Sequence, residues 1–148
     1  MALLRSGLQG ARPADFYLPL WAQGDDTALD IACVSPLQQA TLERASRELG
    51  YSLGMRWHQK WNKYGEACKA EGITFIPMVV ETLGGWEEGA AQVVKKLGQA
   101  LARATGQEDN EVVRHLFGKL SILLQRDNAS LVLNRAPHHP ESSITGDL

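Results

Sequence analysis

Apolar and polar positions along the chain predict three strands. Phe16, Leu18 and Leu20 alternate with other residues, and residues 28–34 form a second, mostly apolar run. Residues 23–26 between them have the composition of a tight turn, so the two runs are predicted to form a β-hairpin. The nearly continuous apolar run 73–81 predicts a central strand buried on both faces. Pro77 within it cannot donate to a strand ladder and indicates a bulge or a local edge.

Helical periodicity predicts four further segments. The first covers residues 36–49, with Ser35 as its cap and Gly50 at its end. After a connection at 51–54, a second helix runs from about 55 to 70, with Trp57, Trp61, Tyr64 and Cys68 on one face. A third covers 86–105. A fourth begins with Asp109 or Asn110 as its cap, and residues 130–133 either continue it or form a short strand.

The order of these elements is a hairpin, two helices, a strand and two helices. It predicts an α/β domain in which a small mixed sheet carries the N-terminal β-hairpin and is flanked by helices. We expect one domain over residues 12–135. Residues 1–11 are expected to be a disordered leader, or the end of a segment that lies upstream in a longer parent, and residues 136–148 a disordered tail.

Composition narrows the class of protein. Hydrophobic residues make up 44% and charged residues 22% of the 148 residues, which is typical of a soluble globular domain. The net charge of −2 argues against a free-standing nucleic-acid binder, which would carry a basic surplus. No apolar run reaches membrane-spanning length and no signal peptide is evident, so we expect no membrane association and an intracellular protein.

Two carboxylates in the hairpin are the first candidate for chemistry. Asp15 precedes the first strand and Asp30 lies within the second, so strand pairing can bring them together. Two neighbouring carboxylates repel each other unless a cation lies between them, which predicts a Mg²⁺ site. The alternative is that Asp15 only ends a turn and that Asp30 faces solvent.

Lys60 and Glu81 are the next candidates. On a helical wheel Lys60 lies beside Tyr64 at the border of the apolar face, so its long side chain can reach the sheet. An ammonium there would stabilise the charge that develops in phosphodiester cleavage, although the same position also suits a surface lysine. Glu81 ends the strand beside Gly84 and Gly85, where it is either a functional carboxylate or the cap of the next helix.

These motifs, taken together, resemble a known family. Arg12-Pro13-Ala14-Asp15, Asp30 and the segment 73–86 are similar to the C-terminal region of reverse-transcriptase polyproteins from eukaryotic non-LTR retrotransposons. That region carries a restriction-like endonuclease of the PD-(D/E)XK fold, and the resemblance covers roughly residues 12–135. Lys60 and Tyr64 are similar to the family's Lys-x-x-x-Tyr helix.

The resemblance implies a restriction-endonuclease-like fold and a nuclear enzyme that nicks target DNA to prime reverse transcription. It implies that Asp15 and Asp30 hold Mg²⁺ or Mn²⁺ and that Lys60 assists, with Tyr64, Glu81 and Arg12 in support. DNA is the implied partner, and the grip on it is expected to come largely from other segments of a longer parent.

Departures from the family pattern motivate two other hypotheses. Asp30 is followed by Ile31 and Ala32, so the sheet lacks an (Asp/Glu)-x-Lys triplet and the lysine must come from the helix. The slightly acidic balance is also unusual for a DNA-cutting domain. The second hypothesis is therefore a non-catalytic relic or interaction domain that keeps the fold, and the third is a small-molecule hydrolase that uses Glu81. The DNA target and the oligomeric state are not specified by the sequence.

Overall fold

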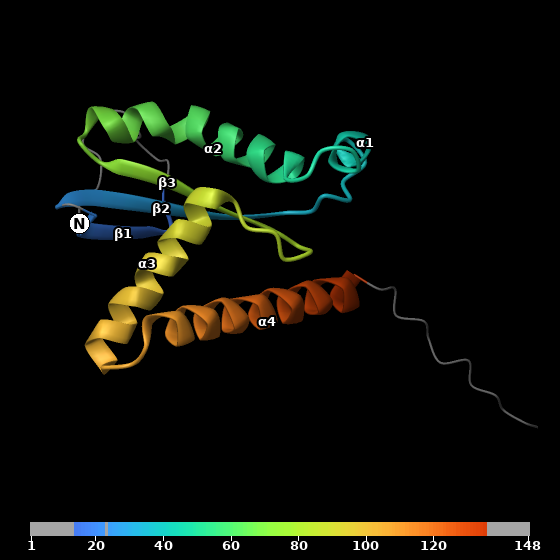
Figure 1. Ribbon diagram of the computed structural model, residues 1–148. Coiled ribbons are helices and arrows are strands. Elements are labelled where there is room, and N and C mark those ends of the chain that lie inside the picture. Colours follow the sequence, from blue (N-terminus) through green and yellow to red (C-terminus); the bar gives the residue numbers. More distant parts are fainter. Residues whose placement is uncertain (1–13, 23, 136–148) are drawn as a thin grey trace, which may run out of the picture.

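A computed structural model describes residues 14–22 and 24–135. It is a mixed α/β structure in which a three-stranded sheet has helices on both faces (Figure 1). Arg12, the predicted leader and the predicted tail lie outside the described residues. The predicted order of a hairpin, two helices, a strand and two helices is confirmed.

The N-terminal hairpin consists of β1 (Phe16–Ala22) and β2 (Asp25–Val34), which pair antiparallel. Gly24 in the connecting turn has a φ of 91°, which glycine adopts without a steric penalty. The register shifts between Leu18 and Ala22, in the part of β1 that contains Pro19. The hairpin predicted from the alternating pattern and the turn residues is thus confirmed.

β3 (Thr74–Glu81) runs parallel to β2, and the strand order is β1-β2-β3. The central strand is therefore β2, and the prediction that residues 73–81 form the central strand is wrong. An apolar run indicates that both faces of a strand are covered, but it does not indicate whether the strand has a neighbouring strand at each of its two edges. Pro77 lies on an edge strand, as its missing N–H group indicated, and it pairs with Asp30 across the sheet.

One face of the sheet is covered by α2 (Tyr51–Ala70), which packs on β2 and β3 and not on β1. Alternate residues of β2 point to this face and join α2 side chains in two buried clusters. Tyr64 and Cys68 are buried, as the helical spacing predicted. The predicted connection at residues 51–54 is instead the first turn of α2, where Ser52 and Leu53 are buried.

The first predicted helix is mostly wrong. Within residues 36–49 only α1 (Leu42–Ala45) is helical, and the rest is turns. Ser35 Oγ accepts a hydrogen bond from the Leu37 N–H at 3.2 Å, but it caps a turn and not a helix. The apolar side chains Leu37, Leu42 and Leu49 are exposed, so this segment has no core against which a helix could be stabilised.

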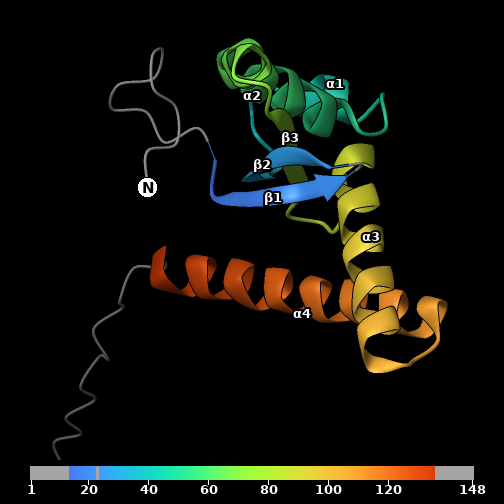
Figure 2. The ribbon, with the colours of Figure 1, turned by 90° about the vertical axis from the view of Figure 1, so that its left-hand side faces the viewer.

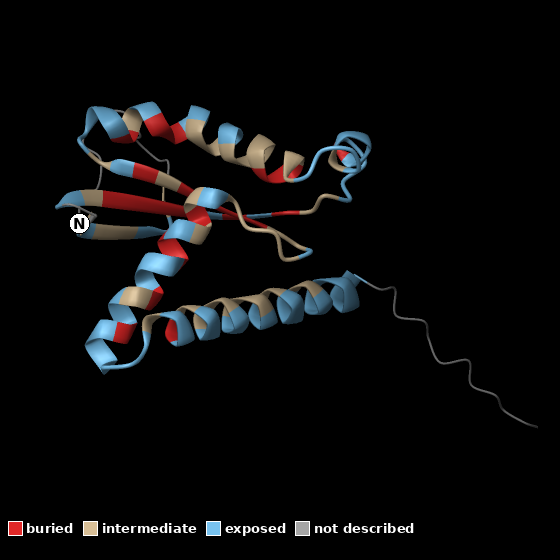
Figure 3. Ribbon diagram, viewed as in Figure 1, coloured by how far each residue is buried: buried red, intermediate tan, exposed pale blue. Residues whose placement is uncertain are grey.

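The other face of the sheet carries α3 (Glu88–Thr105) and α4 (Asp109–Arg135). Figure 2 shows α2 and α4 on opposite sides of the sheet, with α3 leading from the sheet to α4. Residues 130–133 continue α4 and do not form a strand. Figure 3 shows buried residues concentrated in β2, β3 and α3, whereas α4 is largely exposed and buries only Val112.

Two glutamates that the sequence did not single out start these helices. The Glu87 carboxylate accepts the Ala90 N–H at the start of α3, at 3.1 Å. The Glu108 carboxylate accepts the Glu111 N–H at 2.8 Å, so Glu108 caps α4 in place of the predicted Asp109 or Asn110. Backbone hydrogen bonds to the carboxylate lower the pKa of Glu108. In the described part of the chain, no helix has both the length and the apolar character needed to span a membrane.

Candidate active site

Asp15 lies immediately before β1, and its carboxylate bonds to the backbone of β2. Its N–H donates to the Leu29 carbonyl at 2.9 Å, and its Oδ2 accepts the Ile31 N–H at 2.8 Å. Asp15 therefore bonds the backbone on both sides of Asp30, through its own N–H group at Leu29 and through its carboxylate at Ile31. The Asp15 side chain is exposed, so its remaining lone pairs are open to solvent or to a ligand.

Asp30 points to the α2 face from the middle of the central strand. Ala28 and Ala32, the next residues on that face, are small and leave room above the carboxylate. Only 8% of the Asp30 side chain is exposed. The alternative expectation, that Asp30 is a solvent-facing strand residue, is therefore wrong.

Lys60 reaches from α2 to Asp30. Its Nζ lies 2.6 Å from Asp30 Oδ2, and 19% of the lysine side chain is exposed. Oδ2 accepts no other hydrogen bond from the described residues, so the ammonium is its charge partner. The alternative of a surface lysine is likewise wrong, because Lys60 sits on the border of α2 with its head turned into the sheet.

Burial gives this ion pair an energetic consequence. Moving two charges out of water is costly, and their attraction offsets that cost only when the two groups stay in contact. Removing either partner leaves the other charge unpaired in a mostly apolar setting. Lys60 is therefore the charge partner on which the buried Asp30 carboxylate depends.

Tyr64 belongs to the core above the sheet. Its ring lies edge-on to Phe75, 5.9 Å between centroids, and it packs with Ala28 and Cys68. The Lys63 ammonium lies 4.9 Å from the centre of the Tyr64 ring on its other side. Tyr64 thus positions the helix segment that carries Lys60, and none of its observed contacts is with Asp15 or Asp30.

Glu81 lies at the far end of β3 from the ion pair. It follows Pro77, the residue opposite Asp30, by four positions, which is roughly 13 Å along a strand. Its N–H donates to the Gly85 carbonyl at 2.7 Å, and a Cβ at residue 85 would come within 2.9 Å of Glu81 Oε2. The structure therefore does not bring Glu81 to Asp15, Asp30 and Lys60. The next helix is capped by Glu87 and not by Glu81.

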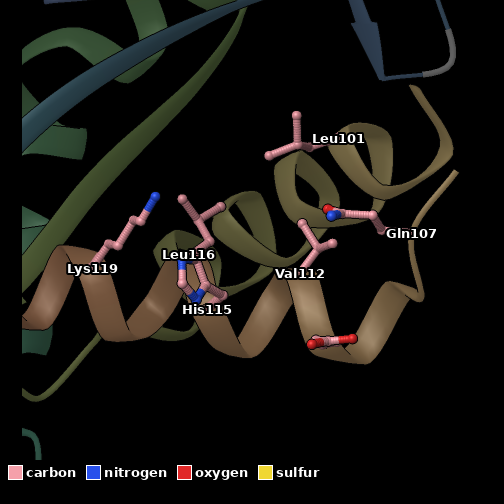
Figure 4. A pocket seen from close by; sticks show the side chains of 7 residues that line it. Leu101, Gln107, Val112, His115, Leu116 and Lys119 are labelled. Atoms are coloured by element: carbon pink, nitrogen blue, oxygen red, sulfur yellow. The ribbon is translucent and has the colours of Figure 1, made fainter. Parts of the chain in front are cut away.

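Two hollows lie away from the ion pair. Figure 4 shows a cavity of about 370 Å³ where α3 meets α4, lined by His115, Lys119, Leu101 and their neighbours. A second, of about 440 Å³, lies between the sheet, α3 and α4. Its lining is wholly apolar: Phe16, Leu18, Leu29, Ile31, Met78, Val80, Trp86, Val94, Leu97, Leu120 and Leu124. Glu81 lines neither hollow, so neither of them supports the small-molecule hydrolase hypothesis.

The residues present bear on whether a divalent metal fits. Among residues 14–22 and 24–135, no three acidic, His or Cys side chains gather as a ligand set. Mg²⁺ commonly uses only one or two protein carboxylates and keeps several waters. Asp15, with its open lone pairs, and Asp30, whose Oδ2 accepts no hydrogen bond from the described residues, are the carboxylates that could meet that smaller requirement.

Two basic residues that were not singled out from the sequence as site candidates lie on the same helix as Lys60. Arg56 and Lys63 lie four residues before and three residues after Lys60 on α2, so all three occupy one border of the helix. The i, i+4, i+7 spacing of these basic residues is the sequence signal that could have indicated a shared position on the helix.

No family model, curated protein or solved structure matches this chain.

Proposed function

We propose that this chain is a restriction-endonuclease-like domain that hydrolyses DNA phosphodiester bonds with Mg²⁺ or Mn²⁺. In the retroelement setting that the resemblance implies, it would nick target DNA, in the nucleus, for reverse transcription. The main support is that Lys60 contacts Asp30 while Asp15 holds the backbone beside Asp30. Three residues that are separated in the sequence thus meet around the middle of β2, which supports the proposal.

Each residue has a role in the proposed reaction. Asp15 and Asp30 would bind the metal ion, which when bound would polarise a phosphoryl oxygen and activate a water. Lys60 would place a positive charge beside the scissile phosphate, where negative charge accumulates in the transition state. Tyr64 keeps α2 seated on the sheet and so fixes the position of Lys60.

A non-catalytic interaction domain or relic is the second candidate. It is favoured by the direct 2.6 Å contact, because the Lys60 ammonium already neutralises the Asp30 carboxylate without a metal. In that case the Lys60–Asp30 pair only helps to hold α2 on the sheet and takes no part in catalysis. The two candidates differ in what a divalent metal does to the protein.

Nicking of supercoiled plasmid in Mg²⁺ or Mn²⁺ tests the proposal, with Asp15→Asn as the main variant. Asparagine keeps an oxygen that can accept the Ile31 N–H but lacks the charge, so the fold is retained while metal binding is lost. We expect the nicking rate to fall at least about a hundredfold, because a metal site loses most of its activity when one of its ligands is removed. Asp25→Asn, an exposed carboxylate at the hairpin turn, is the matched control and should nick normally.

Metal-dependent stabilisation provides the second measurement. Under the nuclease proposal, Mg²⁺ raises the melting temperature of the wild type and has no such effect on Asp15→Asn. If the wild type shows neither nicking nor a metal-dependent shift, the nuclease proposal is wrong and the relic remains. Unchanged nicking in a folded Asp15→Asn protein would also reject the assigned site.

A further inference from the structure

Basic residues of this slightly acidic chain are concentrated on α2. The helix carries four of them, Arg56, Lys60, Lys63 and Lys69, against one acidic residue, Glu66, whereas the whole chain has a net charge of −2. A local surplus of this kind is the usual mark of a surface that meets an anion. The overall charge therefore hides a positive region beside the candidate site.

Three of these side chains lie on the same border of the helix. Arg56, Lys60 and Lys63 fall within about 60° on a helical wheel, at roughly 100° per residue. Together they extend about 10 Å along the axis, at about 1.5 Å per residue. We call this stripe the basic border. Lys60, its middle residue along the helix, contacts Asp30 on the central strand β2.

The other border of α2 packs towards β3. Trp61 lies against Phe75 on β3, with 6.2 Å between ring centroids. By contrast, α2 does not pack on β1, the strand that follows the exposed Asp15. Among the described residues, the basic border therefore lies on the side of α2 opposite Trp61, where Lys60 contacts Asp30.

Its outer charges are available to a ligand. Arg56 Nη1 donates to the Gln59 side-chain oxygen at 3.2 Å, and the Lys63 ammonium lies over the Tyr64 ring. Both contacts restrain the side chain without neutralising its charge. Among the described residues, neither group forms an ion pair with a carboxylate, whereas Lys60 is paired with Asp30.

We infer that the basic border binds the phosphate backbone of a DNA strand and lays that strand over Asp15 and Asp30. This inference rests on the proposed function and deepens it, because it gives the domain a grip of its own. Phosphates of one strand follow each other at about 3.4 Å of helix axis, so a 10 Å stripe spans about three nucleotides. Arg56 and Lys63 would contact the phosphates that flank the one being cleaved.

Binding of a fluorescein-labelled 20-bp duplex, followed by anisotropy in EDTA, tests the inference without any turnover. The variant is Arg56→Gln/Lys63→Gln. Its matched control is Lys95→Gln/Lys96→Gln, which removes two exposed charges from α3 on the other side of the sheet. We expect the first variant to bind about tenfold more weakly and its salt slope to fall by about 1.8, at roughly 0.9 for each lost phosphate contact. The control should bind like the wild type.

Several outcomes would overturn the inference: no wild-type binding at low salt, an equal loss in both variants, or an unchanged salt slope in the first. Circular dichroism establishes that each variant is folded. Because EDTA removes metal chemistry, loss of binding and loss of nicking are separable. If Arg56→Gln/Lys63→Gln binds weakly while the wild type never nicks, the DNA surface stands and the nuclease proposal fails.

Discussion

The two faces of the sheet differ in what they bury. The α2 face is closely packed and contains a charged pair, Lys60 and Asp30, between its two apolar clusters. The α3 face is mostly apolar, with the buried Thr27 hydroxyl as an exception, and it leaves the hollow of about 440 Å³ beneath α4. Burying a charge lowers stability unless the charge is paired, whereas burying apolar area raises it. The α3 face thus supplies stability, and the α2 face gives up some of it to hold a polar group in place.

Substitutions in the buried Lys60–Asp30 pair should give the largest effect on stability, and they test the difference between the two faces of the sheet. Lys60→Met should lower the free energy of unfolding by about 3 kcal/mol, since Asp30 would keep a buried charge without a partner. Urea denaturation at pH 7 measures the loss. The double variant Lys60→Met/Asp30→Leu should recover most of it, because two apolar groups of similar size replace the pair. Equal stability of the single and double variants would contradict this account.

Close packing between α3 and α4 should give the next largest effect. A Cβ at residue 98 would lie 2.7 Å from Val113 Cγ2 and 3.0 Å from Val113 Cα, so the two helices must separate. We expect Gly98→Ala to lower the unfolding free energy by about 2 kcal/mol in urea melts.

The control for that variant is Gly118→Ala on α4, where nothing lies within 4 Å of the added Cβ. It should raise stability by about 0.5–1 kcal/mol, because alanine is the better helix former. If both glycine variants behaved alike, the close approach of α3 and α4 would not contribute to stability.

A half-buried polar contact on the hairpin should give the smallest effect. The Tyr17 hydroxyl donates to Asp26 Oδ2, which lowers the pKa of Asp26 and raises that of Tyr17. Stability from the lowered Asp26 pKa is present above about pH 3.9, its unfolded value, and is lost as pH falls through the folded pKa. Stability from the raised Tyr17 pKa is present below about pH 10 and is lost as pH rises through the folded pKa.

Tyr17→Phe should therefore lower the melting temperature slightly between about pH 5 and pH 9 and approach the wild type at both extremes. Thermal melts from about pH 2 to about pH 11, which include both extremes, measure the difference. A deficit that is constant at all pH values would show that the hydroxyl acts through packing and not through the Asp26 carboxylate.

Local patterns in the sequence were sufficient for much of the fold. Alternation and turn residues gave the hairpin, and the spacing of Trp57, Trp61, Tyr64 and Cys68 gave the buried face of α2. The same wheel placed Lys60 on the border from which it reaches Asp30. These features depend on neighbours within one or two turns or strands, which is why a sequence alone can predict them.

Features that depend on distant neighbours were not predictable in this way. Residues 36–49 have an apolar stripe and a capping serine, yet nothing packs on Leu37 or Leu49 and the helix is not formed. The order of the strands decides three further features. They are the position of β3 at the edge, the distance of Glu81 from the candidate site, and the close Asp30–Lys60 contact. The free charges of Arg56 and Lys63 became evident only once α2 was placed on the sheet.

Proline occurs in both outer strands of the sheet, Pro19 in β1 and Pro77 in β3. Val79 and Glu81 bond outward to residues 87 and 85, so by alternation residue 77 also turns its nitrogen away from β2. An incoming strand would find no N–H group there. The two prolines therefore discourage edge-to-edge stacking of sheets between molecules, a common route to aggregation. We therefore expect that strand addition to this sheet is disfavoured at both edges.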